Sequence, residues 1–183
     1  GRRASAGRIL DMRLALLLVL ASCSAVASPV RAAQKPRPNA LEAALLEDAA
    51  DRKLDRFSLL DAALIASGVR EQLELEAYGN RLRAALRAVE RDLEGRPPAQ
   101  AGKVVLQRLH AGAGGKHLLK KYETHATTLL DVLDDGRFNC VSATVLYVLA
   151  ARDLGLDARG VLLPSHARAD LLVQGKRHLV ETT

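Results

Sequence analysis

The stretch from Asn139 to Gly155, NCVSATVLYVLAARDLG, decides the fold of this chain. Asn139 is a good N-cap, and Gly155 is a typical helix stop. The residues between them are almost continuously apolar, which is typical of a helix buried on most sides. The sequence therefore predicts a buried helix over residues 141–154.

Three strands are predicted after this helix, over 157–163, 167–173 and 176–182, the last two joined as a hairpin by Gln174-Gly175. Ahead of the buried helix, capped segments with helical periodicity predict five more helices. The first begins at Asn39, and the others cover 58–66, 71–93, 102–109 and 129–133. In the long segment the residues expected to face inward are Leu73, Leu75, Leu82, Leu86, Val89 and Leu93. The predicted order is a set of helices, then one buried helix, then antiparallel strands. This order predicts an α+β fold.

The net charge of +6 is concentrated in residues 1–31, which hold five arginines against one aspartate. The rest of the chain is therefore close to neutral and presents no basic face. Aromatic residues make up 3% of the chain, so nucleic-acid bases would find few stacking platforms. Nucleic acid is accordingly not an expected partner.

The first 31 residues have the pattern of an export leader. Met12-Arg13 precedes an apolar run over 14–20, too short to span a bilayer, and small residues follow. Two processing schemes stay open: cleavage after Ala25-Val26-Ala27, or lipidation of Cys23 in a bacterial lipobox. We expect a protein exported to the periplasm or cell envelope, with membrane association through a lipid anchor in the second scheme.

The sequence divides into four expected parts: a leader over 1–31, a proline-rich linker over 32–38, a helical part over 39–126 and a core over 127–183. No cofactor is expected. The glycine loop at 112–115 is not a P-loop, because it lacks the residues of that motif. No metal is expected either, because the histidines do not fall at zinc-ligand spacing.

Cys140 is the candidate nucleophile. Processing of the leader would remove or acylate Cys23 and leave Cys140 as the only free thiol. In the first turn of the buried helix, unpaired N–H groups and the positive dipole end favour a thiolate and can bind an oxyanion. The alternative is that Cys140 is a small, inert core residue.

His166 is the candidate base, and Glu181 is the candidate acid that orients it. His166 opens the strand that follows the turn at Pro164-Ser165, and Glu181 lies 15 residues further, on the partner strand. A hairpin of that length can bring the carboxylate beside the imidazole. A hydrogen-bonded edge histidine is the plainer alternative. The remaining histidines have no position obviously tied to the cysteine: His110, His117, His125 and His178.

The segment 129–161, with Asn139-Cys140 and the turn Leu154-Gly155-Leu156-Asp157-Ala158-Arg159, resembles the core of the transglutaminase-like (papain-type cysteine) superfamily. His166 and Glu181-Thr182-Thr183 match the family's histidine strand and acid-x-Thr motif, although the family usually has Asp in place of Glu181. The helical part ahead resembles the SirB-type bacterial branch, in which tetratricopeptide repeats often follow the core.

The resemblance implies a transglutaminase-like core that is incomplete at its C-terminal end. It also implies a Cys140–His166–Glu181 triad acting as a thiol-dependent hydrolase or acyl transferase, of peptidase or amidase type, on a peptide-like or protein substrate. The oxyanion side chain is expected among Tyr122, His125 and Asn139, with Asn139 the preferred candidate. The alternative function is a non-catalytic scaffold with the same fold.

Overall fold

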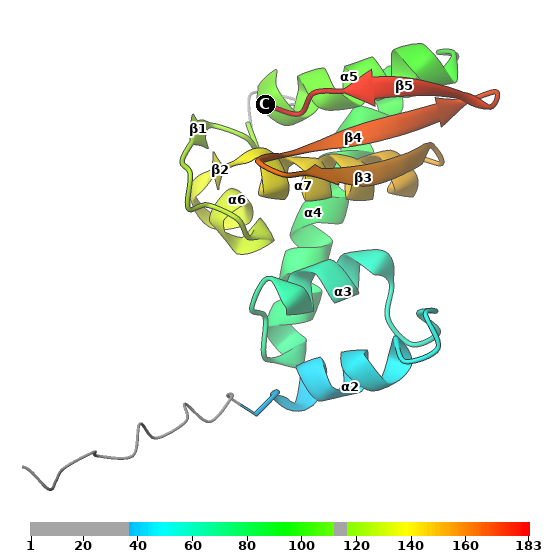
Figure 1. The fold of residues 1–183 in the computed structure, drawn as a ribbon. Helices are drawn as coiled ribbons and strands as arrows, with labels where there is room; N and C mark the ends of the chain where they lie inside the picture. Colours follow the sequence, from blue (N-terminus) through cyan, green and yellow to red (C-terminus); the bar gives the residue numbers. More distant parts are fainter. Residues whose placement is uncertain (1–36, 112–116) are drawn as a thin grey trace, which may run out of the picture. The chain divides into compact units, whose positions relative to one another are not determined.

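The structure is a computed structural model that describes residues 37–111 and 117–183. The expected leader with Cys23, residues 32–36 of the linker and the glycine loop at 112–115 lie outside the described residues. The described part of the chain is α+β, as the sequence predicts, with helices and two small sheets (Figure 1). Within it, no helix combines the length and the hydropathy needed to cross a membrane.

The helix starts follow local polar chemistry. The helices are α2 (Ala40–Asp48), α3 (Leu59–Ala66), α4 (Gln72–Leu93), α5 (Pro98–Ala111), α6 (Leu129–Asp135) and α7 (Cys140–Asp153). Asn39, Ser58, Thr128 and Asn139 cap α2, α3, α6 and α7, each in a reciprocal capping box. These caps satisfy N–H groups that a helix start otherwise leaves unpaired.

Two details of the helical prediction are wrong. Helix α5 begins at Pro98, whereas the sequence indicated a stop there and a helix over 102–109. Proline suits a first helical position because it lacks an N–H that would have no partner there. Leu73 is 80% exposed rather than inward-facing. The buried residues of α4 recur every three or four positions, whereas Leu73 lies only two residues before the buried Leu75. Its side chain therefore points away from the buried face.

The larger sheet has the order β3-β4-β5 and is antiparallel throughout. Its strands are β3 (Asp157–Leu163), β4 (His166–Val173) and β5 (Lys176–Val180). Gln174 and Gly175 both have positive φ, at 51° and 77°, as the two-residue turn of a hairpin requires. The last strand ends at Val180, two residues earlier than expected, so Glu181 and Thr182 follow it outside the ladder.

A second, two-stranded sheet was not predicted. Strands β1 (Lys121–Tyr122) and β2 (Arg137–Phe138) pair in parallel on either side of α6. Strand β2 leads directly into Asn139 and α7. The small sheet therefore fixes the chain immediately before the candidate nucleophile.

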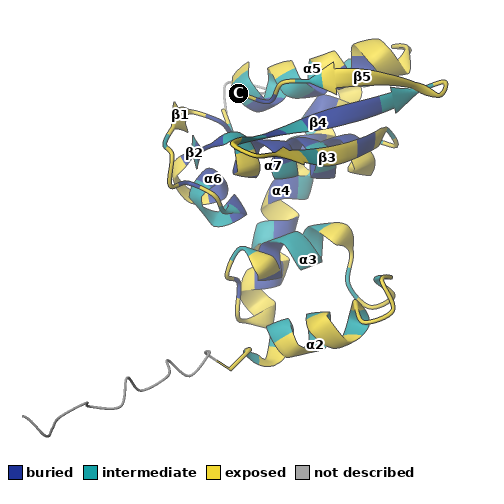
Figure 2. Cartoon of the chain, in the orientation of Figure 1, coloured by how far each residue is buried: buried dark blue, intermediate teal, exposed yellow. Residues whose placement is uncertain are grey.

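Helix α7 lies at the centre of the hydrophobic core. It packs against β3 and β4 on one side and against α3, α5 and α6 on others, and its Ala143, Leu146 and Tyr147 are fully buried. Figure 2 shows the central strand β4 largely buried and the outer strand β5 exposed. Residues from both expected parts, 39–126 and 127–183, contribute to this one core.

Tyr147 provides a test of this core. Its hydroxyl donates to the Gly102 carbonyl at 3.3 Å, and burial raises its pKa from 10.0 to about 12. Above pH 10 the tyrosine ionises in the unfolded chain but not in the folded one, which favours unfolding. The free energy of unfolding should therefore fall by up to about 2 kcal/mol as the pH rises from 10 to 12. Denaturant unfolding of the wild type and Tyr147→Phe at several alkaline pH values should show this extra decline only in the wild type. Parallel pH profiles would contradict it.

Candidate active site

Cys140 is the first residue of α7 and is half-buried. The helix starts here because Asn139 has an extended backbone and its Oδ1 accepts from the N–H groups of Val141 (2.9 Å) and Ser142 (3.2 Å). Ser142 Oγ accepts from the Asn139 N–H in return. Within the described residues, the N–H of Cys140 is a first-turn N–H for which no acceptor is found.

Asn139, the preferred oxyanion candidate, is 5% exposed and is used as a structural cap. Its Oδ1 is occupied by the helix, and its Nδ2 donates to the Thr124 carbonyl at 2.9 Å. The side chain thus ties the start of α7 to the segment after β1. The other two oxyanion candidates, Tyr122 and His125, are exposed.

His166 and Glu181 lie side by side. His166 Nε2 is 2.7 Å from Glu181 Oε2, with side-chain exposures of 33% and 56%. A carboxylate can only accept a hydrogen bond, so Nε2 carries the proton and Nδ1 of the neutral ring is left as the acceptor. The imidazole is therefore oriented by an acid, as the hairpin predicts.

Thr182 anchors the Glu181 segment to two helices. Its hydroxyl is 2.9 Å from Thr144 Oγ1 of α7, and both side chains are buried. Its carbonyl accepts from His110 Nε2 of α5 at 2.9 Å. Thr144 lies four residues after Cys140, on the same face of α7. The face of α7 that carries the thiol is thus the face that meets the residue next to Glu181.

His110 is a contributor that sequence reasoning missed. Besides its bond to Thr182, its ring packs edge-on against Phe138, two residues before Cys140, with 5.5 Å between the ring centroids. Of the other histidines, His117 Nδ1 donates to the His110 carbonyl at 2.6 Å, while His125 and His178 are exposed. Among residues 37–111 and 117–183, no three potential metal ligands gather in one place.

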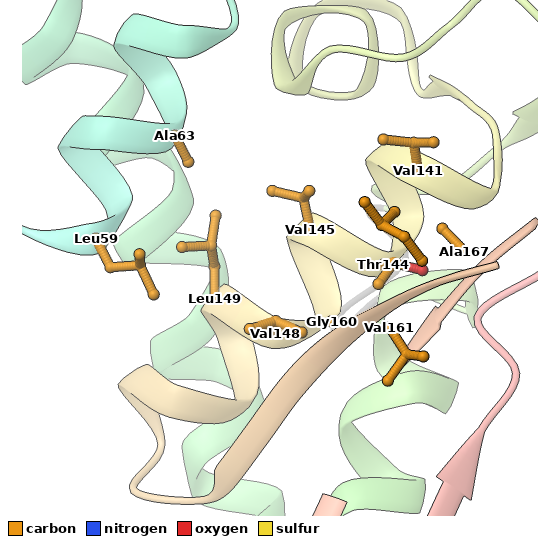
Figure 3. Close-up of a pocket in the computed structure, with 11 residues that line it drawn as sticks. Leu59, Ala63, Val141, Thr144, Val145, Val148, Leu149, Gly160, Val161 and Ala167 are labelled. Carbon is orange, nitrogen blue, oxygen red and sulfur yellow. The ribbon is translucent and has the colours of Figure 1, made fainter. Parts of the chain in front are cut away.

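The starts of α7 and β4 lie at the same end of the core (Figure 1). Val141 and Ala167, the residues that follow Cys140 and His166, line one cavity (Figure 3). Cys140 and His166 therefore begin elements at the same end of the core, and neither of them lines this cavity. The Cys140 thiol and the His166 imidazole are not hydrogen-bonded to each other in this structure.

Charged groups fix the turn before Cys140. Arg137 of β2 forms ion pairs with Asp135 (2.8 Å), Asp131 (3.3 Å) and Glu123 (3.4 Å). Hydrogen bonds to Asp135 and Glu123 raise the pKa of the Arg137 guanidinium, and the Lys121 ammonium holds the pKa of Glu123 below its usual value. These pairs are half-exposed, so they position the β1–β2 sheet more than they stabilise it.

No protein-family model, curated protein or solved structure matches the chain. Membership of the transglutaminase-like superfamily stays a prediction from the sequence.

Proposed function

We propose that this protein is a thiol-dependent hydrolase or acyl transferase in which Cys140 is the nucleophile. His166 acts as its base, and Glu181 orients His166. The observation that carries the proposal is the 2.7 Å His166–Glu181 hydrogen bond at the end of the core where α7 begins with Cys140. A cysteine at a helix start and an acid-oriented imidazole are the parts that nucleophilic acyl transfer needs.

The proposed reaction proceeds in two half-reactions. The Cys140 thiol gives its proton to His166 Nδ1, and the sulfur bonds to an amide or ester carbonyl carbon. The Cys140 N–H donates to the oxyanion that forms. The protonated imidazole then gives its proton to the leaving amine or alcohol as the carbonyl–leaving group bond breaks. Water, or a second amine, then gives a proton to His166 Nδ1 as it bonds to the thioester carbonyl carbon. The carbon–sulfur bond breaks, and His166 returns the proton to the Cys140 sulfur.

Hydrogen bonds between a catalytic thiol and its base are often long before substrate binds, which accommodates the open Cys140–His166 pair. Peptide-like material is the proposed substrate class, and the periplasm or cell envelope is the proposed compartment. Support for export comes from the leader pattern in residues 1–31. Palmitate incorporation that is lost in Cys23→Ala would distinguish lipidation from simple cleavage.

The proposal is tested by the pH dependence of thiol alkylation. With Cys23→Ser as background, Cys140 is the only thiol, and its iodoacetamide rate should stay high at mildly acidic pH. In His166→Ala the rate should fall at least about tenfold there and recover only near the ordinary thiol pKa of about 8.5. Glu181→Gln should fall between the two, because it weakens the orientation of the ring without removing the ring.

His178→Ala is the matched control, because His178 is an exposed histidine of the same sheet. It should leave the alkylation profile unchanged. Circular dichroism shows whether each variant keeps its fold. Identical profiles for the wild type and His166→Ala would mean that the imidazole does not activate the thiol, and the catalytic proposal would fail.

That result would favour the second candidate function, a non-catalytic interaction scaffold. The observation in its favour is the absence of a recorded hydrogen bond from the half-buried Cys140 thiol to His166. In that case Cys140 packs as a small apolar residue at the start of α7.

A further inference from the structure

An open groove of about 350 Å³ runs along α7, with β3 along its side and α3 at one end (Figure 3). Its lining residues on α7 extend from Val141 to Leu149, roughly 12 Å of helix at about 1.5 Å per residue. Leu59 and Ala63 of α3 close the far end, and Gly160, Val161 and Leu162 form the strand side.

The near end of the groove reaches the candidate active site. Val141 and Ala167 line it there, next in sequence to Cys140 and His166. Strand β3 also ends there, since Leu163 pairs with His166. A molecule lying in the groove therefore ends beside the first turn of α7, although Cys140 and His166 do not themselves line the groove.

The walls suit apolar groups. Thr144 is the one lining residue with a polar side-chain atom, and its hydroxyl is already engaged with Thr182. Several lining side chains are nonetheless exposed: Leu59 at 41%, Val141 at 36% and Leu162 at 80%. Exposed apolar residues gathered around a concavity mark a binding site more often than scattered ones do.

The strand beside the groove has a free edge. Within the described residues β3 pairs with no strand other than β4, so its other edge is open to a further strand. At the start of that edge the Ala158 carbonyl already accepts from Arg152 Nε, and the Ala158 N–H donates to the Leu156 carbonyl. An extended peptide added to such an edge bonds to its backbone N–H and C=O groups and points every second side chain to the same face. About four residues of extended chain match the length of the groove.

We propose that the groove binds the peptide substrate of Cys140 in an extended conformation, as an added strand on β3 with alternate apolar side chains against α7. The inference rests on the proposed function and specifies its substrate: a peptide segment with apolar residues at every second position beside the scissile bond. Gly160 makes the site possible, because its missing side chain leaves the strand wall open.

Gly160→Val supplies the test. A Cβ there meets only Thr144 Cγ2, at 3.7 Å, an ordinary contact, so the variant should fold while its side chain fills the groove. Binding is measured in the full chain carrying Cys140→Ala, by fluorescence anisotropy of a fluorescein-labelled peptide of alternating leucine and alanine. Gly160→Val should weaken binding by about tenfold or more, the equivalent of one aliphatic side chain left unburied.

Arg159→Leu is the matched control, because Arg159 points to the opposite face of β3 and its replacement adds apolar surface outside the groove. It should leave the affinity unchanged. A peptide with asparagine in place of leucine, and one with N-methylated backbone amides, should both bind more weakly. No binding at millimolar protein, or equal binding by Gly160→Val, would overturn the proposal.

The readout is independent of catalysis, since these proteins lack the thiol. Groove-dependent binding together with unactivated alkylation of Cys140 would leave the peptide site standing and reject the enzyme. Activated alkylation without groove-dependent binding would reject the peptide site alone.

Discussion

Gly102→Val is expected to lower the free energy of unfolding by about 3 kcal/mol or more. Gly102 is buried in α5, where a Cβ would collide with Leu171 Cδ2 and lie 2.9 Å from Tyr147 Oη. Leu171 and Tyr147 are themselves buried, so neither can move aside without disturbing the contact of α5 with β4 and α7. Urea unfolding followed by circular dichroism measures the loss, and Gly102→Ala should show a smaller part of it.

Gly79→Ala is the matched control, because Gly79 is also a buried glycine inside a helix. The nearest atoms to a Cβ there belong to the guanidinium end of the half-buried Arg83, at 2.9 Å, which can rotate away. Alanine is a better helix former than glycine, so Gly79→Ala should stabilise the protein by up to about 1 kcal/mol. If Gly102→Ala left stability unchanged or raised it, as expected for Gly79→Ala, the close packing around Gly102 would be refuted.

Asn139→Ala is expected to cost about 2–4 kcal/mol, because it removes three hydrogen bonds from a buried side chain. It releases the first turn of α7 and the segment at Thr124 together, so the rapid alkylation of Cys140 at acidic pH should be lost as well. Urea unfolding and the alkylation profile measure the two effects in the same samples.

Asn139→Asp separates the two roles of this side chain. A carboxylate still accepts from Val141 and Ser142 and suits the positive end of α7, but it cannot donate to the Thr124 carbonyl. We expect it to recover roughly half of the stability that alanine loses. If alanine proved as stable as asparagine, the capping bonds would contribute nothing measurable.

Most helices were predictable because their starts depend on neighbours in sequence. Ser58, Thr128 and Asn139 each bond to N–H groups within three residues, so the pattern of the chain contains the whole interaction. The antiparallel hairpin was predictable for the same reason, since its turn at Gln174-Gly175 joins adjacent strands. The start of α5 at Pro98 was missed because proline both ends and begins helices.

The candidate site was predictable only in part. The pairing of His166 with Glu181 follows from the hairpin, and the structure places the two side chains together. The contact of His110 with Thr182 spans 72 residues, and no sequence pattern encodes it. The parallel β1–β2 pair was missed because each strand has two residues and its partner lies beyond α6.

Helix α2 has a consequence for how the protein opens. It has no fully buried residue, and it touches the core through the half-buried Leu41 and Leu45. Detachment of α2 exposes little apolar area, so its amide protons should exchange through a local opening of low free energy. The amide protons of α7 should exchange only when the whole core unfolds. We therefore expect α2 and the core around α7 to open as separate units of unequal stability, with the thiol in the more stable one.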